Sequence, residues 1–217
     1  MSQHDTPTPP PAPRDPERIY ADAARAAEEG RLREATAGYR EALALAPQHL
    51  EARLGLARVL EAEDRLEDAV QLLTEALRAS PDQTEYLAVR GAMLSRLNRY
   101  DDAEADLRRV VRLHPAHGPA LFELGSLLLR RGLPGEAAET LEKLRQVQPE
   151  RLATLTLLAD AQNRVGRLQD ALETLDRALA LDGTDRRALN IYGRVLDRLG
   201  RTEEAAAMYR RAQGYGA

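Results

Sequence analysis

The chain has 217 residues, of which 43% are hydrophobic and only 4% aromatic, so its core must be built mainly from alanine and aliphatic side chains. Its formal net charge of −4 argues against binding to nucleic acid, and the absence of cysteine excludes disulfides and cysteine metal sites. No apolar run approaches the ~20 residues that a membrane helix needs, so we expect a cytoplasmic protein without membrane insertion. Its 31 basic residues include a single lysine, a bias typical of GC-rich, bacterial genomes.

Residues 1–15 are predicted to form a disordered N-terminal tail, because they hold five prolines and almost no apolar side chains. Pro10-Pro11-Ala12-Pro13 contains a P-x-x-P spacing that SH3-like grooves can bind, although a solubilising tail is the simpler interpretation. Asp15 and Pro16 then predict a helix start, with aspartate as N-cap and proline in the first turn.

From residue 16 onward, the sequence repeats every 34 residues, and each copy predicts two amphipathic helices. Within each pair, the helices are separated by a residue that tolerates left-handed backbone: Gly30, Asp64, Asn98, Gly132, Gly166 and Gly200. The predicted repeats span residues 16–49, 50–83, 84–117, 118–151, 152–185 and 186–217. A helical unit of this length cannot bury its apolar face alone, so we expect one domain, 16–217, in which the copies stack.

The residues that recur are small or proline. The twentieth residue of every repeat is alanine, the eighth is alanine or glycine, and four repeats carry proline near their end: Pro47, Pro81, Pro115 and Pro149. This pattern resembles the tetratricopeptide repeat (TPR) family. The resemblance implies an all-α fold, a right-handed α-solenoid of six helix-turn-helix repeats. Arg53 and Arg90 replace apolar residues of the pattern, which indicates looser packing or side chains that extend to water.

The resemblance also implies that the first helix of each repeat lines a concave groove that binds a protein or peptide. The groove positions expected to be exposed include Leu54, Arg58, Ala92, Phe122, Ser126, Thr156, Asp160, Asn163, Asn190 and Arg194. Phe122, the only phenylalanine, is a candidate anchor, or else it packs against its own second helix. Amide and charged groups at the C-terminal end could hold a peptide backbone, or simply form a solvated polar face.

Arginine recurs at the thirteenth position of four consecutive repeats, at Arg96, Arg130, Arg164 and Arg198. Such a ladder could bind an acidic peptide. The alternative is that a cation is favoured there by the C-terminal end of each helix.

We find no catalytic motif in the sequence, and we expect no catalytic residue, metal or cofactor. His114 and His117 have an H-x-x-H spacing, but Pro115 intervenes and no third ligand is close in sequence. No glycine-rich phosphate loop is present.

The sequence therefore predicts a non-enzymatic scaffold or adaptor that binds a peptide segment of a partner protein. One alternative is a self-assembling array. The second repeat holds 8 acidic and 4 basic residues and the sixth 3 and 7, so the ends could associate head to tail, making the protein a monomer or a weak oligomer. Another alternative is an accessory module of an envelope, secretion or enzyme complex.

Overall fold

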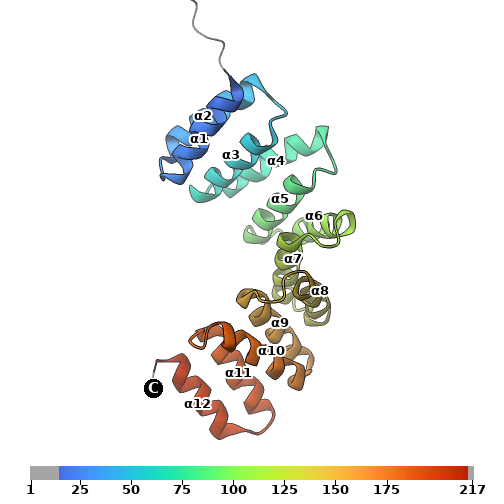
Figure 1. Cartoon of the computed structure of the whole chain (residues 1–217). Coiled ribbons are helices and arrows are strands. Elements are labelled where there is room, and N and C mark those ends of the chain that lie inside the picture. The colour runs from blue at the N-terminus through green and yellow to red at the C-terminus, as the bar shows by residue number, and fades with distance from the viewer. Residues whose placement is uncertain (1–14, 215–217) are drawn as a thin grey trace, which may run out of the picture. The chain divides into compact units, whose positions relative to one another are not determined.

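The computed structural model describes residues 15–214, which form twelve α-helices and no strand (Figure 1). The predicted N-terminal tail lies outside the described residues, apart from Asp15. The helices are α1 (Pro16–Glu28), α2 (Leu32–Leu45), α3 (Leu50–Ala62), α4 (Leu66–Ala79), α5 (Thr84–Arg96), α6 (Tyr100–Leu113), α7 (Gly118–Arg130), α8 (Pro134–Val147), α9 (Leu152–Val165), α10 (Leu168–Leu181), α11 (Arg186–Arg198) and α12 (Thr202–Ala212).

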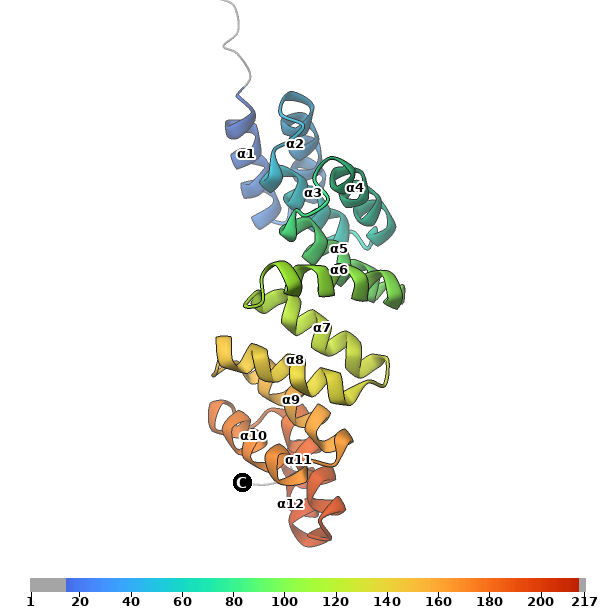
Figure 2. The same cartoon turned by 90° about the vertical axis from the view of Figure 1, so that its right-hand side faces the viewer.

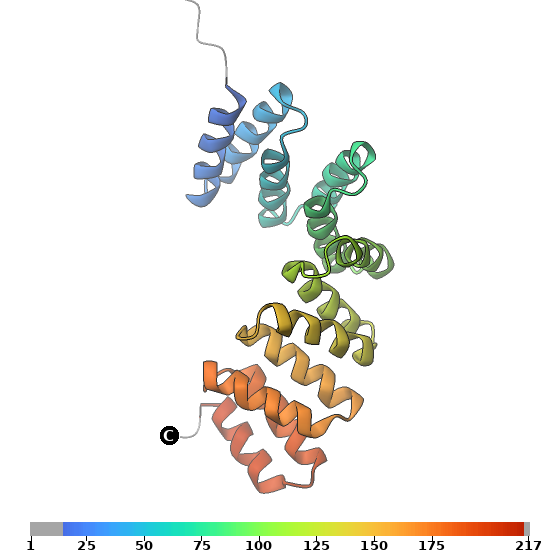
Figure 3. The same ribbon diagram turned by 45° about the vertical axis from the view of Figure 1, so that its right-hand side comes forward.

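The helices divide into two compact units, Met1–Ala79 and Ser80–Ala217. The N-terminal unit contains α1 to α4, and the C-terminal unit contains α5 to α12. Within each unit every helix packs against the next along the chain (Figures 2 and 3). Successive odd-numbered helices, which are the first helices of the repeats, also contact one another within each unit. The fold is an all-α helical-repeat solenoid, as the sequence predicts.

The turns between paired helices adopt left-handed backbone at the residues that the sequence singles out. Asp64 and Asn98 have φ angles of 59° and 60°, and Gly30, Gly132, Gly166 and Gly200 have φ angles between 74° and 87°. Asparagine and aspartate are the non-glycine residues that enter this region most readily. The predicted interruptions of the helix pairs are therefore confirmed.

Side chains cap several first helices at the residue before each helix. Asp15 accepts a hydrogen bond from the backbone N–H of Glu17, as predicted for an N-cap. His117 Nδ1 accepts one from the N–H of Ala120 at 3.1 Å, so this histidine has a structural role at the start of α7. His49 and Asp185 cap α3 and α11 in the same way.

Small residues let the paired helices approach closely. The alanines at the twentieth repeat position are fully buried: Ala35, Ala69, Ala103, Ala137, Ala171 and Ala205. A Cβ atom at Gly125 would lie 2.6 Å from Leu141 Cγ, and one at Gly193 would overlap the ring of Tyr209. Glycine at these two positions leaves room for a large side chain of the second helix.

Arg90 is not a sign of loose packing, because its guanidinium is bonded to Asp106 of the next helix. Its Nε and Nη2 atoms lie 2.7 and 2.8 Å from the two carboxylate oxygens, a bidentate arrangement. The side chain of Asp106 is only 9% exposed and that of Arg90 19%. Arg53 donates a hydrogen bond to the carbonyl of Pro47. None of the described helices is both long and apolar enough to cross a membrane.

Candidate functional site

A pocket of about 530 Å³ lies between the first helices α1 and α3 of the N-terminal unit, with α2 behind it. Its apolar lining comes from all three helices: Tyr20, Ala24, Ala27, Leu32, Tyr39, Leu54, Val59 and Ala62. The Tyr20 ring lies 6.1 Å from the Tyr39 ring and 4.8 Å from the His49 ring, centroid to centroid. Tyr20 and Tyr39 form one wall of a concave, mostly apolar site of the kind that binds ligands.

Tyr39 supplies a polar group within this pocket. Burial raises the pKa of its hydroxyl, and the nearby Tyr20 adds to the effect. A tyrosine hydroxyl is protonated at neutral pH even at its ordinary pKa, so this one can donate a hydrogen bond to a bound carbonyl.

The rim of the pocket carries three exposed charges. Glu51 on α3 lies 3.3 Å from His49 Nδ1. The other two are Arg58 on α3 and Glu28 on α1. Among the described residues, neither side chain forms an ion pair or a hydrogen bond. Both are thus available to a bound molecule at no cost of breaking an internal pair. Of the predicted groove residues, Arg58 is exposed as expected, whereas Leu54 is only 9% exposed and forms part of the pocket wall.

The C-terminal unit differs, because its first helices are tied to each other by arginine side chains. Arg130 donates to Ser95 Oγ at 2.5 Å, Arg164 to the Leu129 carbonyl at 3.4 Å, and Arg198 to Asn163 Oδ1 at 2.9 Å and to its carbonyl. Each bond reaches the end of the preceding first helix, where carbonyls lack partners within the helix. All four members of the predicted arginine ladder are exposed, and Arg130, Arg164 and Arg198 also make these internal contacts.

Asp160 lies at the centre of a second internal cluster. Its carboxylate is 2.9 Å from Arg164 Nη2, one turn along α9, and 3.0 Å from Arg194 Nη2 on α11. Asp160, Asn163 and Thr156 are 3–5% exposed, although the sequence led us to expect exposed groove positions. The reason is that α9 packs against α7, α8, α10 and α11, which together bury ten of its fourteen residues.

The other predicted groove residues remain accessible to varying degrees. Phe122 is partly exposed, and the Arg151 guanidinium lies 4.5 Å from its ring centroid, which is close enough for a cation–π contact. Ala92 and Ser126 are partly buried. Asn190 is exposed and donates to the carbonyl of Arg186 at 2.7 Å. The structure thus brings Asp160 and Arg194 together, and leaves Asn190 apart from that pair.

Sequence reasoning missed Tyr39 and Glu28 as members of a site. A signal for Tyr39 existed, because most repeats place leucine at its position, and tyrosine there occurs only at 39 and 209. No signal marked Glu28, since glutamates occur on ten of the twelve described helices. Among the described residues, no group of three or more histidine, aspartate or glutamate side chains is arranged to hold a metal ion.

Family models of the tetratricopeptide repeat match residues 26–93, 94–150 and 156–216. The chain belongs to the tetratricopeptide repeat family. Its repeats and helical fold are those of a protein–protein interaction scaffold, a fold that is typically non-enzymatic. No curated protein matches the sequence.

Solved TPR proteins share the fold at low sequence identity. The pilF protein of Pseudomonas aeruginosa has a TM-score of 0.77 and 21% identity over 89% of this chain and 88% of its own. YrrB, described as a TPR protein with an unusual peptide-binding site, has a TM-score of 0.72 and 17% identity over 82% of this chain and 91% of its own. MamA from Desulfovibrio magneticus RS-1 has a TM-score of 0.70 and 22% identity over 75% of this chain and 92% of its own.

Proposed function

We propose that this TPR protein is an adaptor that binds a peptide segment of a partner protein on its first-helix face, the side formed by the first helices of the repeats. The primary anchor site is the α1–α3 pocket. An apolar side chain of the peptide enters between Ala24 and Leu54, and Arg58 pairs with a carboxylate of the same segment.

The observation that carries this proposal is the unpaired Arg58 beside an apolar pocket. Arg58 and Arg194 occupy the same repeat position, and the matching residues one repeat earlier are Ala24 and Asp160. Arg194 is bonded to Asp160, whereas alanine offers Arg58 no carboxylate. At this repeat position, the guanidinium of the N-terminal unit is therefore free to bind a ligand, whereas that of the C-terminal unit is paired within the chain.

The volume of the pocket is also suitable. At about 530 Å³ it falls within the range of sites that bind small ligands, and it is large enough for one or two side chains of a peptide. In the C-terminal unit, the exposed Asn190 and the partly exposed Phe122 remain proposed contacts. Arg194 also remains one, because about half of its side chain surface is exposed despite its pair with Asp160.

The test is an affinity capture from native lysate with the wild-type chain and an Ala24→Leu, Arg58→Glu variant. Leucine at position 24 should fill part of the pocket, and it is a good helix former, so α1 should be retained. Glutamate at position 58 reverses the charge of an exposed side chain. Both changes should leave the helical content, measured by circular dichroism, unchanged. The captured partner should bind the variant at least about tenfold more weakly, which corresponds to the loss of one good interface contact.

The matched control is Arg78→Glu, which reverses an exposed arginine of the same unit outside the pocket. Among the described residues, Arg78 has no ion pair or hydrogen bond. A partner lost by the pocket variant and kept by the control supports the proposal. Equal recovery on all three proteins contradicts it, and recovery of the chain itself alone favours self-association instead.

A further inference from the structure

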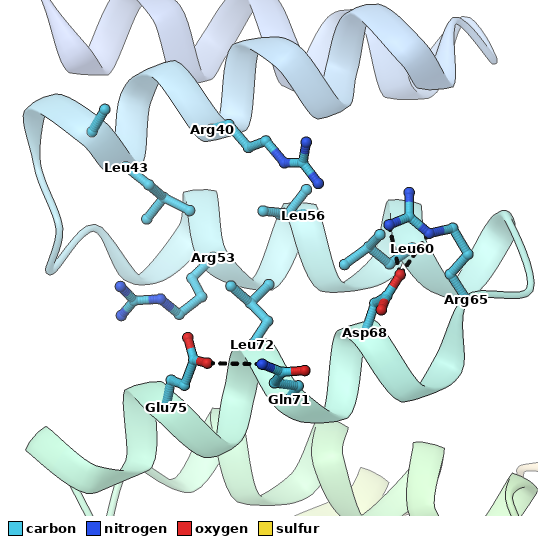
Figure 4. A pocket seen from close by; sticks show the side chains of 11 residues that line it. Arg40, Leu43, Arg53, Leu56, Leu60, Arg65, Asp68, Gln71, Leu72 and Glu75 are labelled. Carbon is cyan, nitrogen blue, oxygen red and sulfur yellow. Dashed lines mark hydrogen bonds and ion pairs between the residues drawn. The ribbon is translucent and has the colours of Figure 1, made fainter.

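The N-terminal unit has a second cleft, on its second-helix face between α2 and α4 (Figure 4). Its volume is about 450 Å³, and leucines from three helices form its floor: Leu43, Leu56, Leu60 and Leu72. Arg40 of α2 stands on one edge, and Glu75 of α4 stands on the other. This cleft shares no lining residue with the α1–α3 pocket.

Arg40 is the unusual residue of this cleft. Figure 4 shows its guanidinium over the cleft without an interaction, and among the described residues it has no ion pair or hydrogen bond. The acidic side chains opposite are already engaged. Asp68 is held by Arg65 at 2.6 Å, and Glu75 Oε1 accepts from Gln71 at 3.1 Å.

The same position two repeats later shows what this arginine does when carboxylates are within reach. Arg108 of α6 lies 2.7 Å from Glu104 on its own helix and 2.5 Å from Glu136 on α8. The ion pair with Glu136 connects the two second helices α6 and α8. Arg131 also pairs with Glu104, which extends the network.

The N-terminal unit lacks this connection for two reasons that are visible in the sequence. The residue that corresponds to Glu104 is Thr36, which has no carboxylate. The residue that corresponds to Glu136 is Asp68, which is one methylene shorter and is bonded to Arg65. The α2–α4 cleft therefore keeps an arginine without a counter-ion. Beneath it, Leu43 and Leu72 are partly exposed, whereas Leu56 and Leu60 are buried.

We propose that this cleft is a second binding site, and that its occupant is an amphipathic helix of a partner protein with an acidic residue beside its aliphatic stripe. A groove between two helices with an apolar floor fits aliphatic side chains spaced at i, i+3, i+4 and i+7. The acidic residue pairs with Arg40, in the way that Glu136 pairs with Arg108 inside the chain.

This site is independent of the proposed peptide site on the first-helix face. Its charge favours an acidic rather than a basic helix, because three arginines and only two carboxylates line the cleft: Arg40, Arg53, Arg65, Asp68 and Glu75. Asp68 is paired with Arg65, and Arg40 has no ionic partner among the described residues. Burial of the partly exposed Leu43 and Leu72 supplies affinity, and Arg40 supplies the selection by charge.

The probe that tests this proposal is a display library of helical peptides, selected against the full-length chain. Enriched peptides are synthesised with a fluorophore, and each is paired with a version in which its glutamates and aspartates are replaced by lysine. Fluorescence polarisation should show binding of the acidic peptide, and a loss of at least about tenfold for its lysine version.

Two charge-reversal variants then locate the site. Arg40→Glu should weaken the acidic peptide by at least about tenfold and restore part of the binding of the lysine version. Arg58→Glu, in the other pocket, should leave both affinities unchanged. Because Arg40 is exposed and unpaired, its reversal should not unfold the helices, which circular dichroism checks.

Three results would overturn the proposal: no helical peptide is enriched, the enriched peptides are indifferent to Arg40→Glu, or they respond to Arg58→Glu instead. The last result would place their binding in the α1–α3 pocket and would support the proposed peptide site while removing this one.

Discussion

The two units use the same repeat differently. In the C-terminal unit, Arg194 is bonded to Asp160, and Arg108 is bonded to Glu104 and Glu136. In the N-terminal unit, the corresponding arginines, Arg58 and Arg40, have no such partner, and each borders a pocket. Whether an arginine at a repeat position is paired within the chain or available to a ligand thus depends on a few facing residues. For Arg194 and Arg58 the facing residue is Asp160 or Ala24. For Arg108 and Arg40 the facing residues are Glu104 and Glu136, or Thr36 and Asp68.

The largest effect on stability is expected when an internal ion pair of the C-terminal unit loses its carboxylate. Asp106→Ala leaves the guanidinium of Arg90 without its buried bidentate partner, so we expect the free energy of unfolding to fall by about 3 kcal/mol. Urea unfolding followed by circular dichroism measures it. The control is Asp102→Ala, whose carboxylate pairs with Arg99 in an exposed position and should change the stability by less than about 0.5 kcal/mol. Equal losses would contradict an internal role for the buried pair.

Part of this difference between the two units can be predicted from the sequence, and part of it cannot. The repeat period predicts the helix pairs, and the left-handed residues at their turns are confirmed at Asp64 and Asn98. The exposure of the first helices is less predictable, because it depends on how the neighbouring helices pack. Thr156 and Asn163 stand at positions expected to be exposed, yet α9 is enclosed by its neighbours and buries both.

Pairing across repeats is the other feature that sequence reasoning did not resolve. The bond from Arg194 to Asp160 spans one full repeat, and local spacing rules consider only neighbours three or four residues apart. The pocket beside Tyr39 depends on the same long-range packing. The sequence therefore predicts roughly which helices form the groove surface. It does not predict which arginines on that surface are paired within the chain.

A graft of the missing acid should convert the peptide pocket to the closed form. Ala24→Asp places a carboxylate where Asp160 stands in the C-terminal unit, so Arg58 gains the internal partner that Arg194 has. We expect the captured partner to bind this variant about tenfold more weakly, because its acidic residue must now compete with the introduced carboxylate for the guanidinium. Titration by fluorescence polarisation measures the change. An affinity that rises or does not change would contradict a role for Arg58 in binding the partner.

Removal of the carboxylate at position 104 should make the free energy of unfolding depend less on pH in the acidic range. Burial raises the pKa of Glu104, but hydrogen bonds and charge from Arg108 and then Arg131 outweigh it, so the net pKa lies below its ordinary value. A carboxylate with a lowered folded-state pKa adds stability above its unfolded pKa and loses it as the pH falls through the folded one. Glu104→Gln should therefore cost about 1 kcal/mol at pH 7 and almost nothing below the folded pKa. Urea unfolding across pH 3 to 7 checks this, and a constant difference would contradict it.

The smallest effect is expected from the reverse graft in the second cleft. Thr36→Glu offers Arg40 the i, i+4 partner that Glu104 gives Arg108, so we expect a gain of about 0.3 kcal/mol in the free energy of unfolding. The same change should weaken the acidic helical peptides severalfold, since Arg40 is then paired within the chain. Thr36→Gln, which matches the size without the charge, serves as control. A similar gain in both variants would assign it to the longer side chain and not to the ion pair.

The central difference between the two units is that, among the described residues, Arg198 is paired within the chain and Arg58 is not. Partner capture by Arg58→Glu and Arg198→Glu, side by side and with the thermal unfolding of each variant recorded, tests this difference. Arg198 is bonded to Asn163, so its reversal should lower the unfolding temperature and leave the folded protein able to capture the partner. Reversal of Arg58 should weaken capture severalfold without changing the unfolding temperature. Capture lost with Arg198→Glu and kept with Arg58→Glu would contradict the account.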